Sequence, residues 1–143
     1  MRNPARLAVA LGLLGAAAAL PAPALAATSK AKLGYYADNA TNRNMTLNVA
    51  RNLKKLSVFQ VACLNSAGRQ GGVIVARNVP ISDRGTFRID GNVSVTTGSS
   101  RFTTKMLITG AFQANRVVGS SVARGRTCGT VRFNGRYYGN AQG

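Results

Sequence analysis

The fold is decided by the stretch RFTTKMLITGAFQANRVVGSSVARGRTCGTVRFNGRYYG, from Arg101 to Gly139. Its first part alternates between apolar and polar residues, and this period of two is typical of a half-buried strand. The apolar face consists of Phe102, Met106, Ile108 and Phe112. Short polar connections at 113–116 and 123–126 separate this part from two more apolar segments. The stretch therefore predicts three consecutive antiparallel strands.

The chain before this stretch keeps the same alternation. The predicted core faces are Met45, Leu47 and Val49 in one segment and Phe59, Val61 and Cys63 in another. Residues 64–72 predict a flexible loop, and Asp90-Gly91-Asn92 predicts a hairpin turn. After residue 26, no segment of more than ten residues has a helical period. We therefore expect an all-β fold of about seven or eight antiparallel strands, closed as a two-sheet sandwich or, as the alternative, as a small β-barrel.

Residues 1–26 have the three parts of a secretory signal peptide. Arg2 and Arg6 form the positive start, residues 7–20 the apolar run, and Ala24-Leu25-Ala26 the small-residue cleavage site. The apolar run is shorter than the roughly 20 residues of a membrane-spanning helix, which is the alternative. We expect a signal peptide over 1–26, a flexible lead-in over 27–33 and a single domain over 34–143. The protein would then be secreted, or associated with the cell surface.

The two cysteines predict a disulfide bond. Cys63 and Cys128 are the only cysteines of the chain, and an exported protein meets an oxidising environment in which such a bond persists. A reactive thiol and a metal site are the alternatives. A metal site would lack partners, because the chain contains no histidine and only three acidic residues. We therefore expect a structural disulfide.

The residues that most enzymes use at neutral pH are scarce in this chain. Histidine is absent, and Asp38, Asp83 and Asp90 lie in turn-like contexts, where aspartate is favoured because it bonds its own backbone. The G-x-S-x-G nucleophile pattern does not occur. We expect a protein that is not an enzyme and has no cofactor or metal, with a small hydrolase of unrecognised site as the alternative.

The charge departs most from that of an ordinary domain. The chain carries 19 basic and three acidic residues, and loss of residues 1–26 removes only Arg2 and Arg6. Such a surface attracts polyanions, among them anionic cell-wall polymers. The candidate polyanion-binding residues are Arg124, Arg126, Arg132, Arg136, Lys54 and Lys55. The first four would form a ridge beside Tyr138; the alternative is that the charge only solubilises the protein.

Two tyrosine pairs lie near the ends of the expected domain, Tyr35-Tyr36 and Tyr137-Tyr138. Alternation turns one ring of each pair inward and the other outward. We expect Tyr36 and Tyr138 to be the outward rings, which would form a stacking platform if the terminal strands are neighbours. This arrangement indicates the alternative function, a carbohydrate- or protein-binding module that uses loops and tyrosines.

Short motifs extend over nearly all of the expected domain. They are GYY at Gly34, VFQVAC, FRIDG, ITGAF, VVGSSV and CGTVRF. In this layout the chain resembles small secreted two-cysteine β-sandwich proteins of actinobacteria, most of them hypothetical proteins of unknown function. It departs from them in its high charge and in Phe133, where many would have tryptophan. The resemblance implies a disulfide-stapled sandwich and supplies no catalytic residue. We expect a binding or structural protein of the cell envelope.

Overall fold

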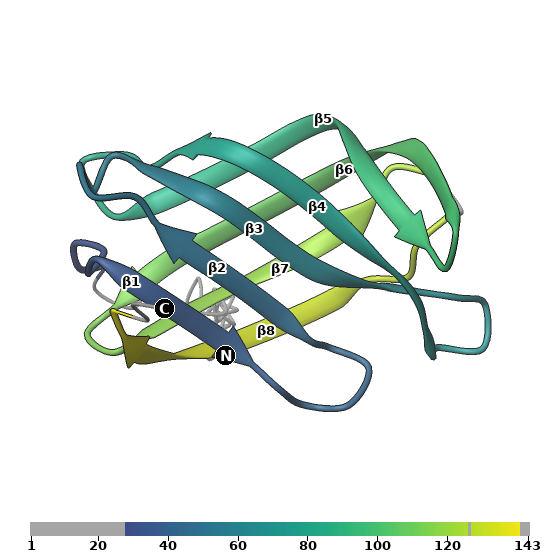
Figure 1. Cartoon of the computed structure of the whole chain (residues 1–143), viewed down its shortest axis with the longest axis horizontal. Coiled ribbons are helices and arrows are strands. Elements are labelled where there is room, and N and C mark those ends of the chain that lie inside the picture. Colours follow the sequence, from purple (N-terminus) through teal and green to yellow (C-terminus); the bar gives the residue numbers. More distant parts are fainter. Residues whose placement is uncertain (1–27, 126, 141–143) are drawn as a thin grey trace, which may run out of the picture.

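The computed structural model describes residues 28–125 and 127–140, and within them all regular structure is β (Figure 1). The strands are β1 Gly34–Asp38, β2 Met45–Val49, β3 Lys55–Leu64, β4 Gln70–Pro80, β5 Thr86–Thr97, β6 Ser100–Gln113, β7 Arg116–Ala123 and β8 Val131–Gly139. The expected all-β fold of seven or eight antiparallel strands is confirmed. The predicted signal peptide lies outside the described residues.

The strands form one ring-like sheet, because each strand pairs with the next and β1 pairs with β8. Two of these pairings are short. β4 pairs with β5 only over Val73–Val75, and β1 pairs with β8 only over Tyr35–Ala37. These two seams divide the ring into β1–β4 and β5–β8, and β6 and β7 pass behind β2 and β3 in Figure 1. The ring thus combines the two layers of a sandwich with the closure of a small barrel.

The seam between β4 and β5 is open along part of its length. Beyond Val75 the strands separate, and they meet again only at the bridge between Ile81 and Phe87. A hollow of about 370 Å³ lies between them, lined by residues of 75–80 and 88–94. Each strand is therefore paired with both of its neighbours, but the pairing of β4 with β5 covers only part of their length.

The core contains the apolar residues that alternation placed inward. All three residues of each predicted face in β2 and β3 are buried, and so are Met106, Ile108 and Phe112 of β6, whereas Phe102 is half-buried. Five buried aromatic rings form a continuous chain of contacts, with centroid separations of 5.1 to 6.0 Å between neighbours. In order of contact they are Tyr36, Phe112, Phe87, Phe59 and Phe133. This cluster crosses the interior and joins both halves of the ring.

Two glycines let the strands behind this cluster approach closely. Gly110 of β6 lies directly opposite Gly119 of β7. A Cβ at Gly119 would lie 2.5 Å from Cζ of Phe133 and 2.0 Å from the carbonyl oxygen of Thr109. The ring of Phe133 therefore occupies the place that a side chain at Gly119 would need, an arrangement in which an aromatic residue covers a glycine.

The predicted disulfide bond is confirmed. Cys63, near the end of β3, is bonded to Cys128 in the connection between β7 and β8. The next residue of each segment continues the contact, because Leu64 and Gly129 form an isolated bridge. The bond joins residues 65 positions apart and ties the β1–β4 half of the ring to the β5–β8 half.

Two local expectations are corrected by the structure. β5 runs straight through Asp90-Gly91-Asn92, and the turn lies beyond Thr97, which pairs with Ser100. Gly91 has a φ of 144°, which glycine adopts without strain, and the strand continues through it without reversing. The lead-in is held against the ring: the Ser29 N–H donates to the Phe112 carbonyl oxygen at 2.8 Å, and Ala31 is buried.

Candidate functional site

The outer face of β8 carries a row of exposed polar side chains. Arg132, Asn134, Arg136 and Tyr138 are exposed, and they alternate with buried Val131, Phe133 and Gly135. Successive outward side chains of a strand are about 7 Å apart. Arg132 and Arg136, four residues apart, share this exposed face of β8, and its role in binding stays a prediction.

A third arginine, which sequence reasoning missed, joins this row from β7. Arg116 is the direct cross-strand partner of Arg136, and its Nη1 donates to Oδ1 of Asn134 at 3.1 Å. Like charges at directly opposite positions of a sheet are unfavourable. We call Arg116, Arg132 and Arg136 the β8 basic face. Arg116 could be assigned to this face only through the pairing register of β7 and β8.

The carboxylates that form ion pairs in the described part of the chain neutralise other arginines. Asp90 of β5 accepts from Arg88 at 3.2 Å and from Arg124 at 3.1 Å. Arg124 is therefore drawn across β6 toward β5, away from β8. The predicted ridge is thus corrected: Arg132 and Arg136 lie in one row with Tyr138 on β8, Arg124 does not belong to this row, and Arg126 lies outside the described residues.

The carboxylate of Asp38 is buried at the seam between β1 and β8. It pairs with Nε of Arg43 at 3.0 Å, and it accepts from the backbone N–H of Asn134 at 2.9 Å. The buried carboxylate of Asp38 therefore holds the end of β1 against β8. It leaves the outward arginines of that strand without compensation from this acid.

The two lysines of the predicted set lie on another part of the ring. Lys54 ends the turn between β2 and β3, and Lys55 begins β3. β3 is separated from β8 by β1 and β2 in the order of the ring. The structure therefore does not bring Lys54 and Lys55 together with the β8 basic face.

The prediction that Tyr36 and Tyr138 both point outward is wrong for Tyr36, and the exposed position of Tyr138 agrees with it. Tyr36 is fully buried, so it cannot stack on a ligand, whereas Tyr138 is 54% exposed. Tyr35 takes the outward place in β1, and its ring centroid lies 6.1 Å from that of Tyr138. Since β1 and β8 are neighbours, Tyr35 and Tyr138 form one aromatic pair next to Arg136.

The phenol of Tyr36 has a structural role. Burial raises its pKa, and the hydrogen bond that the backbone N–H of Lys32 donates to Oη at 3.1 Å lowers that pKa in part. The neighbouring Tyr137 donates from its Oη to the carbonyl oxygen of Leu33 at 2.5 Å. The hydroxyl groups of Tyr36 and Tyr137 therefore hold the lead-in against the β-sheet.

No protein-family model, curated protein or solved structure matches the chain. Among the described residues no group of three histidine, cysteine or acidic side chains is placed to hold a metal ion. A search of the same residues for a helix of the length and apolarity needed to cross a membrane finds none. The resemblance to secreted actinobacterial proteins and the expectation of a non-enzymatic role stay predictions.

Proposed function

We propose that this protein is a secreted, non-enzymatic binding protein of the cell envelope that holds anionic polymers on the outer face of β7, β8 and β1. The observation that carries the proposal is the cross-strand pair of Arg116 and Arg136. The ion pairs of residues 28–125 and 127–140 leave out both of these arginines and Arg132. An anion bound between Arg116 and Arg136 would relieve their repulsion, so the folded surface favours binding an anionic group.

The form of this surface suits a polymer better than a small ion. Arg132 and Arg136 are separated by about 14 Å along β8, and Tyr138 continues the row. Several charges in a line bind a chain of repeated anionic groups and release its counterions, so affinity falls with salt. The aromatic pair of Tyr35 and Tyr138 at one end would contact a sugar or another ring of the same polymer.

The test is retention of the protein lacking residues 1–26 on a cell-wall fraction and on DNA across a salt titration. The informative variant is Arg132→Gln/Arg136→Gln. Its matched control is Arg77→Gln/Arg101→Gln, which removes the same charge from exposed positions on β4 and β6. We expect the first variant to reduce the salt dependence by about two units of the log–log slope. Equal losses in both variants would show that net charge alone explains binding and would overturn the assignment of this face.

A carbohydrate-binding role is the second candidate, and the contact between Tyr35 and Tyr138 favours it. Stacking of a sugar on an aromatic ring depends little on ionic strength. Binding to a neutral polysaccharide that survives salt and is lost in Tyr138→Ala would support this candidate. Binding that is unchanged in Tyr138→Ala would exclude the tyrosine pair.

A further inference from the structure

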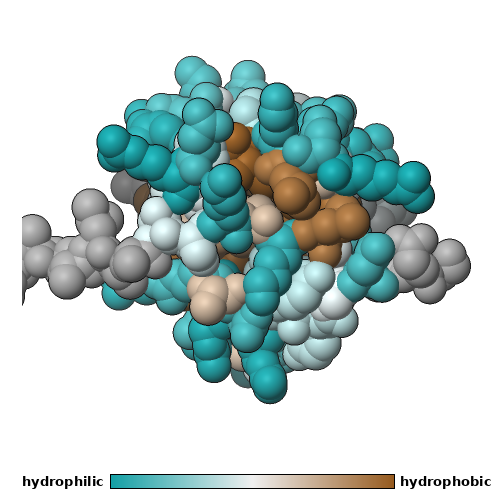
Figure 2. Space-filling model, turned by 90° about the vertical axis from the view of Figure 1, so that its left-hand side faces the viewer, coloured by the Kyte–Doolittle hydropathy of each residue, from teal (hydrophilic) through white to brown (hydrophobic). Residues whose placement is uncertain are grey.

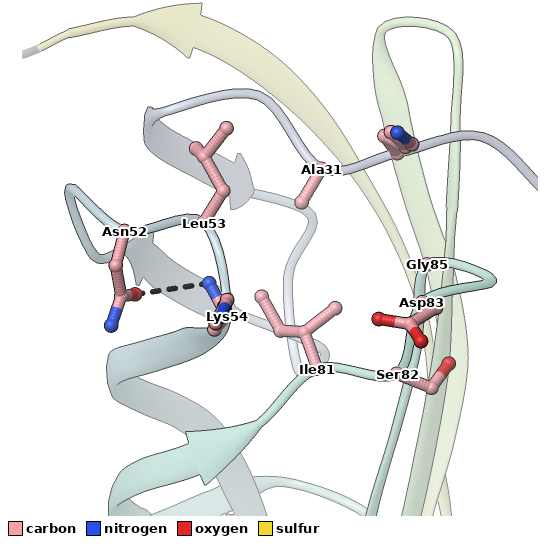
Figure 3. A pocket seen from close by; sticks show the side chains of 9 residues that line it. Ala31, Asn52, Leu53, Lys54, Ile81, Ser82, Asp83 and Gly85 are labelled. Atoms are coloured by element: carbon pink, nitrogen blue, oxygen red, sulfur yellow. Dashed lines mark hydrogen bonds between the residues drawn. The ribbon is translucent and has the colours of Figure 1, made fainter.

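One end of the ring has an apolar centre surrounded by polar residues (Figure 2). At this end the lead-in, the turn between β2 and β3 and the turn between β4 and β5 enclose a hollow of about 380 Å³. Ala31, Leu53 and Ile81 supply its apolar lining, one from each segment (Figure 3). Lys30, Lys54 and Asp83 also line it. The hollow therefore joins an apolar surface to a charged rim.

Leu53 occupies its position at a cost to the fold. Its φ is 60°, in the left-handed region that glycine and asparagine adopt more readily. The Leu53 N–H closes the turn by donating to the Ala50 carbonyl oxygen at 2.9 Å. The side chain is nevertheless 45% exposed. Its burial therefore offsets little of the conformational strain at Leu53. Folding alone does not explain a leucine here, and strained residues of this kind concentrate at functional sites.

The charge around Leu53 is strongly positive. The segments 29–33, 50–54 and 81–85 together contain five basic residues and one acid, Asp83. The basic residues are Lys30, Lys32, Arg51, Lys54 and Arg84. Lys30 and Lys54 line the hollow, and the other three belong to the same three segments. Such an array complements a broad anionic surface.

We propose that this end of the ring docks on an anionic membrane surface, with Leu53 inserted among the acyl chains and the surrounding lysines and arginines on the lipid headgroups. Apolar insertion combined with basic residues is the general way in which a surface-bound protein holds anionic lipid. A protein partner is less well matched, because a stable interface buries about 800 Å² on each side, whereas the exposed apolar centre depends on one leucine. The proposal does not involve the β8 basic face.

The first test is flotation of the protein lacking residues 1–26 with vesicles of phosphatidylglycerol and phosphatidylcholine, compared with phosphatidylcholine alone. We expect binding only to the anionic vesicles. Leu53→Asn keeps a residue that tolerates the left-handed conformation and removes the apolar side chain, so it should lower the vesicle partition coefficient about tenfold without lowering the melting temperature. Val122→Thr is the control, because Val122 is also exposed but lies on β7. It should bind as the unaltered protein does.

The second test concerns charge. Lys30→Gln/Lys54→Gln should reduce vesicle binding about fivefold for each lysine, and Arg77→Gln/Arg101→Gln should reduce it much less. Three results would overturn the proposal: no binding of the unaltered protein to anionic vesicles, unchanged binding in Leu53→Asn, or equal losses in the two charge variants. If Leu53→Asn is unstable, Leu53→Gly provides the same removal at a position where glycine fits. The Arg132→Gln/Arg136→Gln experiment on polymers stays independent of these outcomes.

Discussion

Replacement of Gly119 by alanine tests whether β6, β7 and the ring of Phe133 approach as closely as described. The new Cβ would lie 2.0 Å from the Thr109 carbonyl oxygen and 2.8 Å from Cα of Gly110. Both of these atoms belong to the backbone of β6, so no side-chain rotation can relieve the contact. Ordinary van der Waals contact needs 3.4 Å or more. The strands would have to separate by more than an ångström, or the alanine would have to displace the sheet locally.

Overpacking of a well-packed core costs about 1 to 3 kcal/mol. Because the clash at Gly119 is with backbone, we expect a loss at the upper end, about 3 kcal/mol. For a domain of this size that loss corresponds to a fall in melting temperature of about 12 °C or more. The matched control is Gly71→Ala in β4, where the Cβ would lie 3.6 Å from Cβ of Asn65. This alanine fits, so stability should be unchanged or should rise by about 0.5 kcal/mol.

The assay is urea unfolding of both variants with the disulfide bond intact, followed by circular dichroism. A second variant separates the two clashes. Gly119→Ala/Phe133→Leu removes the contact with the ring but keeps the contact with the Thr109 carbonyl oxygen, so it should not recover stability. If Gly119→Ala unfolds within about 0.5 kcal/mol of the unaltered protein, a range typical of harmless surface changes, the close approach of β6 and β7 is refuted.

Three further changes test the interior of the ring. Cys63→Ala/Cys128→Ala should lower the free energy of unfolding by about 4 kcal/mol, the chain-entropy value for a loop of this length; a loss below about 1 kcal/mol in urea unfolding would contradict that account. The hydroxyl of Ser121 is buried and finds no hydrogen-bond partner among the described residues, so Ser121→Ala should be neutral or stabilising by about 1 kcal/mol, and a clear loss in the same assay would reveal a missing partner. The raised pKa of Tyr36 means that its stabilising contribution is complete below the ordinary value near 10 and is lost as pH rises through the raised pKa. Tyr36→Phe should therefore flatten the alkaline fall in melting temperature, Tyr138→Phe should not, and parallel curves for all three proteins would exclude Tyr36 as the cause.

The parts of the fold that depend on local alternation were predictable from the sequence. Met106, Ile108 and Phe112 follow one another at even spacings of two and four residues, and each is buried. The same alternation continues through Phe87, Ile89, Gly91, Val93 and Val95, so it already argued against a turn at Gly91. The aspartate–glycine signal for a turn competes with this longer pattern, and the pairing of β5 with β6 runs without a break through Gly91.

The candidate site depended on register, which no local pattern contains. Arg116 faces Arg136 through the register of β7 against β8, two strands that residues 124–130 separate in the sequence. Alternation places Arg124 on the outer side of the sheet with Val122. The side chain of Arg124 points toward β5 because it forms an ion pair with Asp90 there. Alternation could say that one of Tyr35 and Tyr36 points inward, but only the packing of Tyr36 on Phe112, with centroids 5.1 Å apart, says which one.

The open stretch of the seam between β4 and β5 has a consequence for local unfolding. Amide groups of residues 76–79 that point toward β3 face the strand with which β4 pairs, whereas those that point toward β5 face the hollow. Hydrogen exchange in this part of β4 should therefore alternate between slow and fast residues along the strand. The bond between Cys63 and Cys128 still links the two halves when this seam widens. The seam between β4 and β5 can thus open locally while the disulfide bond keeps the two halves of the sheet together. Exchange of a few amides in β4 would report this local opening without global unfolding.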